Sequence, residues 1–254
     1  MAAILTVEQR RARILAEIDR AGGVRITGLG SLVGVSDVTA RRDVENLAER
    51  GLVRRVRGGA MRRAAGPGPD HGAGLRAKAA IARTSARLVR PGEVIGLLAG
   101  DITLLLAREL SGVPGLSVVT NAIPIADAFD ERSGRMVLLL GGVRSRSGAL
   151  TGPVAERAAA GLNVDVVFAG VSSMDARRGF AAPGAAEARV GAALIAAARR
   201  VVVLADHTAW EAGGGAVIAP LEAAEVVVTD EGLCRAGRSA LRHRAGRLII
   251  TAVP

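Results

Sequence analysis

The chain has 254 residues, half of them apolar, and a formal net charge of +10. A chain of this length can bury a sizeable core and is expected to form two domains. Its single cysteine, Cys234, excludes a disulfide framework and a cysteine-based zinc site, and its three histidines are scattered without a metal-binding spacing. We therefore expect no metal site and no cofactor.

We expect neither a membrane helix nor a signal peptide. No apolar segment approaches the roughly 20 residues that span a bilayer. The apolar run at the N-terminus is short and is followed by charged residues. We expect a cytoplasmic protein without a membrane partner.

The positive charge is concentrated at the N-terminal end. Residues 1–63 contain 13 arginines against 7 acidic residues and supply +6 of the net +10. A codon bias would explain why Lys78 is the only lysine, but it would not explain the clustering. The asymmetry indicates a partner that carries phosphates.

The first predicted elements are two helices with a short strand between them. A capping box at Thr6–Gln9 starts the first helix. Residues 24–26 predict the strand and residues 27–34 the second helix, in which Gly28 and Gly30 each lower the helix propensity by about 1 kcal/mol. We expect this second helix to be the least stable part of the domain.

A third helix is predicted from Ser36 to Gly51. Ser36 is a suitable N-cap, and a glycine is the common residue after a helix C-terminus. Ala40, Val44 and Leu47 recur with the helical period and form the buried face. The opposite face, near the N-terminus, presents Val38, Thr39 and Arg42.

A basic strand over residues 52–57 then leads into a Gly58-Gly59 turn. The DNA major groove admits one helix, whose first turns reach base edges while flanking cations hold phosphates. We expect Thr39 and Arg42 to contact base edges and Val38 a thymine methyl group. The glycine turn would let the hairpin approach the DNA backbone closely. The phosphate-binding candidates are Ser36, Arg41, Arg55 and Arg57. A solvated amphipathic helix beside a basic surface strand is the alternative.

Residues 35–60 resemble the winged helix-turn-helix of the DeoR family of bacterial transcription regulators. The shared pattern is VS-x-x-T-x-RRD-x-x-x-L-x-x-x-G-x-x-x-R-x-x-GGA. Arg57 replaces the usual histidine and Ala40 the usual isoleucine, and neither change removes a DNA-facing group. The resemblance implies sequence-specific binding to double-stranded operator DNA.

Residues 63–76 are rich in Gly, Pro and Ala without an apolar period, which predicts a linker. We therefore place the first domain at 1–62 and the second at 77–254. The second domain begins with a predicted helix at 77–89. Short apolar runs alternating with helical segments then imply a Rossmann-like α/β domain, with a mostly parallel sheet covered on both faces. The runs are 94–99, 116–120, 136–140, 164–169, 201–205, 225–229 and 248–252.

Small and polar residues follow these runs, at the sheet edge where ligands of such folds bind. Turn chemistry explains each exit separately, but their convergence on one edge favours a pocket. The candidate effector-binding residues at these exits are Gly100, Asp101, Thr103, Asn121, Gly141, Gly142, Arg144, Gly170 and Asp206.

Most of residues 75–254 resemble the DeoR-type sensor domain, whose fold is similar to ribose-5-phosphate isomerase and the CoA-transferases. Matching segments include Lys78–Ala82, Thr120–Asn121, Gly141–Gly142, Asp165–Val171 and Val203–Asp206. The family generally binds phosphorylated sugars or related metabolites there, which alters DNA affinity. The resemblance implies a regulator of a carbohydrate-related operon, and we expect it to be a repressor. A small effector such as a sugar or sugar phosphate would control it.

The sequence departs from the family at the ligand site. The usual phosphate turn D-x-G-T-T-T reads Leu98–Thr103 here, so only Gly100 and Thr103 carry over. Asp101 is negatively charged, as a phosphate is. We expect it to compete with a phosphate for the backbone N–H groups at the start of the next helix. The family segment E-x-x-V-K reads Glu187–Gly191 here, which adds Glu187 to the effector-binding candidates. Gly191 and Ala209 stand where the family usually has lysines. An unphosphorylated polyol, a cationic or neutral metabolite, and the absence of a ligand all stay open.

A homodimer or homotetramer is expected, because one such domain offers a small DNA-reading surface. One alternative function is an isomerase-like or transferase-like enzyme with an appended DNA-binding domain. It would need a base such as Asp101 or Glu187 beside a cation, and without the lysines we expect no catalytic residue. A second alternative is a DNA binder whose C-terminal domain only oligomerises.

Overall fold

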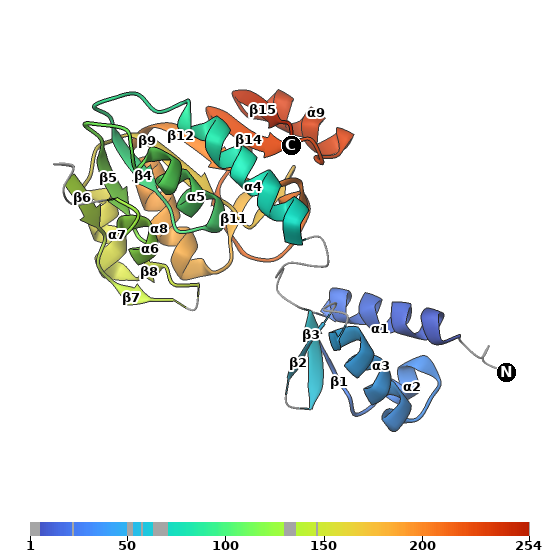
Figure 1. Ribbon diagram of the computed structural model, residues 1–254. Coiled ribbons are helices and arrows are strands. Elements are labelled where there is room, and N and C mark those ends of the chain that lie inside the picture. Colours follow the sequence, from blue (N-terminus) through green and yellow to red (C-terminus); the bar gives the residue numbers. More distant parts are fainter. Residues whose placement is uncertain are drawn as a thin grey trace. The chain divides into compact units, whose positions relative to one another are not determined.

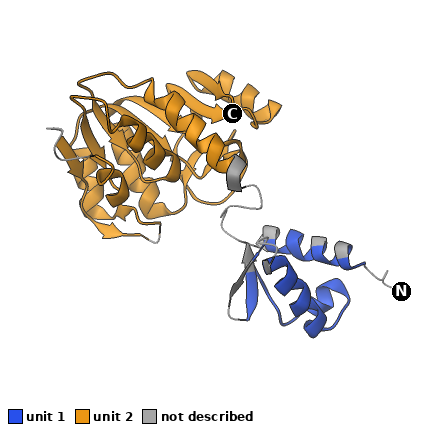
Figure 2. Cartoon of the chain, viewed as in Figure 1, with its two compact units in different colours: residues 1–71 blue, residues 72–254 orange. Residues whose placement is uncertain are grey.

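The computed structural model describes residues 6–21, 23–49, 53–56, 58–62, 71–129, 136–145 and 147–253 (Figure 1). The chain forms two compact units, Met1–His71 and Gly72–Pro254 (Figure 2). Within the described residues, no helix is long and apolar enough to cross a membrane.

The first unit is a winged helix-turn-helix, as predicted. Its three strands form an antiparallel sheet in the order β1-β3-β2. Ile14, Val44 and Leu47 lie at the centre of its core. Its helices are α1 (Val7–Ala21), α2 (Leu29–Val33) and α3 (Asp37–Glu49), and its strands are β1 (Gly23–Arg25), β2 (Val53–Val56) and β3 (Gly59–Arg62).

Two local features of this unit can be compared with the prediction. The capping box is confirmed, because the Gln9 N–H donates to Thr6 Oγ1 at 3.2 Å and the Thr6 N–H to Gln9 Oε1 at 3.1 Å. Helix α2 is shorter than the predicted 27–34, since Gly28 has a left-handed φ of 90° before its first turn. A Cβ at Gly30 would lie 2.4 Å from the Val35 carbonyl oxygen. Both glycines are therefore required by the turn, which helix propensity alone did not show.

The second unit is an α/β domain. Its helices are α4 (His71–Ala86), α5 (Asp101–Leu110), α6 (Ile123–Ala126), α7 (Pro153–Ala160), α8 (Ala185–Ala196) and α9 (Arg235–Arg244), with short 3₁₀ turns η2 (His207–Ala209) and η3 (Leu221–Ala223). Helix α4 starts at His71, so the prediction of a helix starting at 77 is wrong, and the last six residues of the predicted linker 63–76 are helical. The stretch 63–70 lies outside the described residues.

Seven parallel strands form the main sheet, in the order β15-β14-β12-β9-β4-β5-β6. They are β4 (Val94–Leu97), β5 (Ser117–Thr120), β6 (Met136–Leu139), β9 (Val164–Gly170), β12 (Ala198–Leu204), β14 (Val226–Asp230) and β15 (Arg247–Thr251). Each corresponds to one predicted apolar run, so the predicted fold class is confirmed.

Five short strands were not predicted. A small antiparallel sheet contains β10 (Ser173–Asp175), β11 (Gly179–Ala182) and β13 (Ala216–Ala219), and a hairpin contains β7 (Val143–Arg144) and β8 (Leu150–Thr151).

Successive side chains of the central strand β9 point to opposite faces of the main sheet, as strand geometry requires. Val166 and Phe168 pack in one core cluster together with residues of α4, α5 and α6. Val167 and Ala169 pack in the other, with residues of α7, α8 and α9. Helices therefore cover both faces, which explains why the strands are almost purely aliphatic.

Candidate DNA interface and effector site

Helix α3 is fixed to the first unit by its inner face. Ala40 and Val44 are fully buried and Leu47 is 1% exposed, as predicted. Ser36 caps the helix, since its Oγ accepts the Thr39 N–H at 3.2 Å. The Ser36 hydroxyl also lies 2.9 Å from the Thr39 hydroxyl. The first turn of α3 is therefore anchored on one side, and its outer side is presented to solvent.

The outer face of α3 carries side chains that the protein itself does not use. Val38 is 67% exposed. Arg41 and Arg42 are exposed, and neither has a hydrogen-bond or ion-pair partner within the described residues. Thr39 is half-buried, and its hydroxyl faces Ser36. Val38 and Arg42 are four residues apart and share a face, so a methyl surface and a guanidinium are displayed side by side.

Strands β2 and β3 form the wing, with Val56 opposite Gly59. Gly58 occupies a left-handed turn position, at φ 79°. A Cβ at Gly59 would lie 2.3 Å from the Val24 carbonyl oxygen, so the approach of β1 requires this glycine. Arg55 belongs to β2, but its side chain lies outside the described residues, as does the whole of Arg57.

A buried ion-pair cluster joins α1 to α3. The Asp43 carboxylate is 3% exposed and accepts hydrogen bonds from Arg10 Nε and, at 2.9 Å, from Arg11 Nε. Burial acts to raise the pKa of Asp43, but the hydrogen bonds and charges of the two arginines outweigh it and lower the pKa. This role of Asp43 was not predicted from the sequence. The available signal was a carboxylate at the inner face of an amphipathic helix, directly before Val44.

In the second unit, the direction of chain progression across the sheet reverses next to β4. The chain passes from β4 to β5 and β6 on one side and reaches β9 on the other. A parallel sheet offers a ligand crevice at such a switch point, beyond the carboxyl ends of the strands. Gly100 follows β4 and Gly170 ends β9, and a Cβ at Gly170 would lie 3.9 Å from the Gly100 Cα. The two strand exits are therefore in contact.

A small cavity of about 30 Å³ lies at this switch point. It is large enough for one or two water molecules but not for a sugar. It brings together three of the predicted effector residues, Asn121, Gly170 and Glu187. The other residues lining it are Leu98, Ala99, Ala149, Ala182, Pro183 and Ile218. None of the lining residues that the structure describes is a cation.

The side chains of two predicted effector residues are already hydrogen-bonded to the protein's own backbone. The Asn121 side chain accepts the Ala99 N–H at 2.8 Å and donates to the Leu150 carbonyl oxygen at 3.2 Å. The Thr103 hydroxyl is buried and donates toward the Leu98 carbonyl oxygen at 2.6 Å. These side chains hold the strand exits together.

Asp101 behaves differently from the prediction. It is the first residue of α5, but the hydrogen bond that its carboxylate makes within the described residues is to Lys78 and not to a helix amide, so the expectation that Asp101 competes for the helix amides is wrong. Its carboxylate is 83% exposed and accepts a hydrogen bond from Lys78 Nζ at 3.1 Å. The negative charge at the phosphate turn is therefore partly offset by the only lysine of the chain.

Glu187 is linked to the loop between β7 and β8. Its Oε1 accepts hydrogen bonds from the Ser145 hydroxyl at 2.9 Å and the Ser147 hydroxyl at 2.6 Å. The sequence analysis did not identify this contact, which joins positions some 40 residues apart. Arg144, just before Ser145, is exposed and does not line the cavity.

The remaining predicted effector residues have local roles. A Cβ at Gly142 would lie 2.3 Å from the Thr151 carbonyl oxygen, so the β7–β8 hairpin requires a glycine there. Gly141 is exposed next to Val154. Asp206 caps the turn η2 by accepting the Thr208 N–H at 2.9 Å. None of these three residues lines the cavity.

The two missing family lysines stand at closed positions. A Cβ at Gly191 would lie 3.1 Å from Ile218 Cγ2 and 3.4 Å from Leu98 Cδ1, which leaves no path for a longer side chain. Ala209 is 7% exposed in η2. The sites are filled by apolar packing instead of cations.

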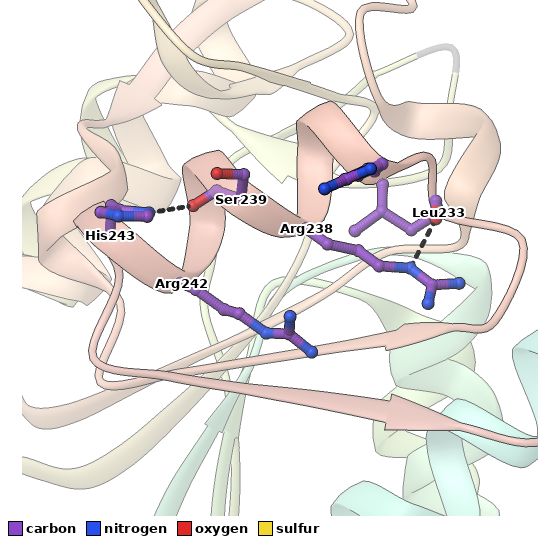
Figure 3. A pocket seen from close by; sticks show the side chains of 6 residues that line it. Leu233, Arg238, Ser239, Arg242 and His243 are labelled. Atoms are coloured by element: carbon purple, nitrogen blue, oxygen red, sulfur yellow. Dashed lines mark hydrogen bonds between the residues drawn. The ribbon is translucent and has the colours of Figure 1, made fainter.

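A second depression of this unit lies elsewhere, along α9 (Figure 3). It measures about 540 Å³ and contains no predicted site residue. Its arginines include Arg238, which donates to the Leu233 carbonyl oxygen at 2.7 Å. All of its walls come from one helix and the loop before it, so it is an open surface feature. The smaller cavity at the switch point, by contrast, is lined by three of the predicted effector residues. No group of three His, Cys, Asp or Glu side chains among the described residues could hold a metal ion.

Comparison with known proteins agrees with both units. Residues 10–64 match the DeoR-like helix-turn-helix domain, and residues 74–231 match the DeoR C terminal sensor domain. The solved structure of ribose 5-phosphate isomerase A from Methanocaldococcus jannaschii is 18% identical, covers 52% of this chain and 53% of its own, and superposes with a TM-score of 0.39. A similarity of that size carries no inference about the chemistry of this chain.

Several curated relatives span nearly the whole chain. The HTH-type transcriptional regulator YgbI of Escherichia coli K12 is 32% identical and covers 92% of this chain and 93% of its own. The transcriptional repressor AccR of Agrobacterium fabrum is 30% identical and covers 89% of this chain and 91% of its own. The HTH-type transcriptional regulator GlpR of Haloferax volcanii is 30% identical and covers 87% of this chain and 89% of its own. The chain therefore belongs to the DeoR family of transcriptional regulators.

Proposed function

We propose that this regulator binds a specific operator by inserting α3 into the major groove. The observation that carries the proposal is the division of α3 into a buried inner face and an outer face on which Val38, Arg41 and Arg42 have no partner among the described residues. Reading base edges requires a helix whose inner face is packed against its domain and whose outer face is exposed.

The proposed contacts follow from what each side chain has available. Arg42 can donate two hydrogen bonds to a guanine edge, and Val38 can contact a thymine methyl group. Thr39 reaches a base edge by exchanging its Ser36 hydrogen bond for one to the DNA. Arg41 holds phosphates from α3, together with Arg55 and Arg57 of the wing and the hydroxyl hydrogen of Ser36.

For the second unit, we propose that an effector opens and enters the switch-point cavity. Among the residues that the structure describes, the lining offers the Glu187 carboxylate and no cation, and Asp101 stands at the start of α5. This chemistry favours a neutral or cationic polyhydroxyl compound over a sugar phosphate, because a phosphate dianion would meet like charge without a counter-charge in the lining. The regulated operon is then a carbohydrate-related one, as in the family at large.

Effector binding would change DNA affinity by favouring one arrangement of a homodimer or homotetramer over another. A catalytic role is not proposed. The two carboxylates that an isomerase-like activity would use are already hydrogen-bonded, Glu187 to Ser145 and Ser147 and Asp101 to Lys78.

Mapping the sites that the protein occupies on its own genome supplies the operator. The affinity for that operator and for random duplex DNA is then measured as a function of salt. We expect the operator to be bound at least 1000-fold more tightly at physiological salt, with a similar salt slope for both DNAs. Equal affinity for the two DNAs would contradict the proposal and favour a non-specific binder.

A further inference from the structure

Strand β6 ends the main sheet with an unusually apolar edge. Within the described residues, β5 pairs with one side of β6 and no strand pairs with the other. The eight residues 136–143 contain no charge and no proline. Met136 is 62% exposed, Leu138 38% and Leu139 40%. These residues lie on both faces of the strand, because successive side chains alternate.

Neighbouring elements extend this apolar surface. Ile123 of α6, which packs beside β6, is 39% exposed, and Val143 of β7 is 73% exposed. Val154 of α7 is 55% exposed and lies beside Gly141. We call this surface the β6 patch; its members are Ile123, Met136, Leu138, Leu139, Val143 and Val154.

The opposite edge of the same sheet is protected. Strand β15 begins with the exposed Arg247, and its apolar residues 248–250 are half-buried. Natural edge strands are usually shielded by charges, prolines, bulges or covering elements. Strand β6 contains neither a charged residue nor a proline. Its sequence is typical of an interior strand, which is apolar on both faces.

We propose that β6 is a subunit interface, at which the β6 of a second copy of the chain pairs antiparallel about a two-fold axis. Such a contact is isologous, so it closes after two copies and prevents further growth along the exposed edge. Residues 64–254 hold 21 Arg and Lys against 17 Asp and Glu, a net charge of +4, so two copies of this unit carry net charge of the same sign. The uncharged β6 patch is where they can approach with the least repulsion and the most apolar burial.

The role of the pair rests on the proposed function, because joining two chains supplies the two DNA-reading heads that a two-fold operator needs. The pairing itself does not rest on that function. It therefore makes a prediction about the protein without DNA.

The interface is tested with the full-length double variant Leu138→Lys/Val143→Lys and the matched control Val217→Lys, which alters an exposed valine of β13 outside the patch. The molar mass is measured by light scattering after gel filtration. We expect the wild type and the control to have twice the chain mass of 25.9 kDa, or an even multiple, and the double variant to have half the wild-type mass. Circular dichroism of the double variant should match the wild type.

Hydrogen exchange identifies the pairing itself. The Leu140 N–H donates to Thr120 of β5, so the N–H groups of Val137 and Leu139 point away from β5. We expect these two amides to exchange slowly in the wild type and rapidly in the double variant. A monomeric wild type, an unchanged mass in the double variant, or fast exchange of both amides in the wild type would overturn the proposal. Loss of operator specificity in a dimeric wild type would instead overturn the proposed function and leave the interface standing.

Discussion

The two units use their polar side chains in opposite ways. On α3, the candidate contact residues Arg41 and Arg42 are exposed and unpartnered within the described residues. At the sheet edge of the second unit, Asn121 and Thr103 are already hydrogen-bonded to backbone groups, and Glu187 to two serines. The first arrangement is open to a partner. The second is a closed frame, which a ligand must rearrange before it can bind.

The largest expected effect is on DNA reading. Arg42→Ala should remove a base contact worth about 2 kcal/mol in each half-site, so that an operator bound by two copies loses about 4 kcal/mol, roughly 1000-fold in affinity. Arg13→Ala removes one exposed arginine from α1 of the same unit and serves as the control. Fluorescence anisotropy with operator and random DNA measures both. An unchanged operator affinity would refute the groove assignment of α3.

The next effect concerns the frame of the first unit. Asp43→Asn leaves Arg10 and Arg11 without their buried counter-charge and should destabilise this unit by about 3 kcal/mol, as measured by urea unfolding.

The same substitution should change the pH dependence. The pKa of Asp43 is lowered in the folded protein, so its stabilisation is present above the ordinary pKa of an aspartate and is lost as the pH falls through the folded value. The stability difference between wild type and Asp43→Asn should therefore shrink in acid. A constant difference from pH 7 to pH 3 would show that the carboxylate charge is not what matters.

A smaller effect is expected at the sheet edge. Asn121→Leu leaves the Ala99 N–H and the Leu150 carbonyl oxygen without partners and should destabilise the second unit by about 2 kcal/mol. Asn163→Leu, at an exposed position before β9, is the matched control. Thermal unfolding that is equal for the two variants would mean that Asn121 does not hold the strand exits together.

The smallest effect is expected at Asp101. Asp101→Thr removes an exposed carboxylate and leaves Lys78 unpaired, so the binding of a sugar phosphate should improve by about 1 kcal/mol, roughly fivefold. Calorimetric titration of a sugar phosphate into this variant, the wild type and the exposed control Asp127→Thr measures the gain. No gain, or a loss, would show that the charge of Asp101 does not exclude phosphates.

The sequence predicted regular features well because they are periodic. All seven strands of the main sheet follow from aliphatic runs, and the inner face of α3 follows from Ala40, Val44 and Leu47. The short strands β7, β8, β10, β11 and β13 were missed, since their pairing depends on tertiary contacts rather than on local pattern.

The sequence indicated which residues lie near one another at the candidate site, but not the hydrogen bonds that they make. Strand exits suggested Asn121 and Gly170 and the family pattern suggested Glu187, and the cavity brings the three together. The hydrogen bonds from Ser145 and Ser147 to Glu187 and the carbonyl contact that requires Gly30 depend on the folded geometry. No spacing in the sequence encodes them.

The central claim is that the outer face of α3 reads bases, and selection of bound DNA from a random pool tests it most directly. The wild-type chain and Arg42→Ala are used side by side. We expect the variant to lose its preference at one or two adjacent base pairs in each half-site while the other positions keep theirs. Identical preferences for the two proteins would contradict the account.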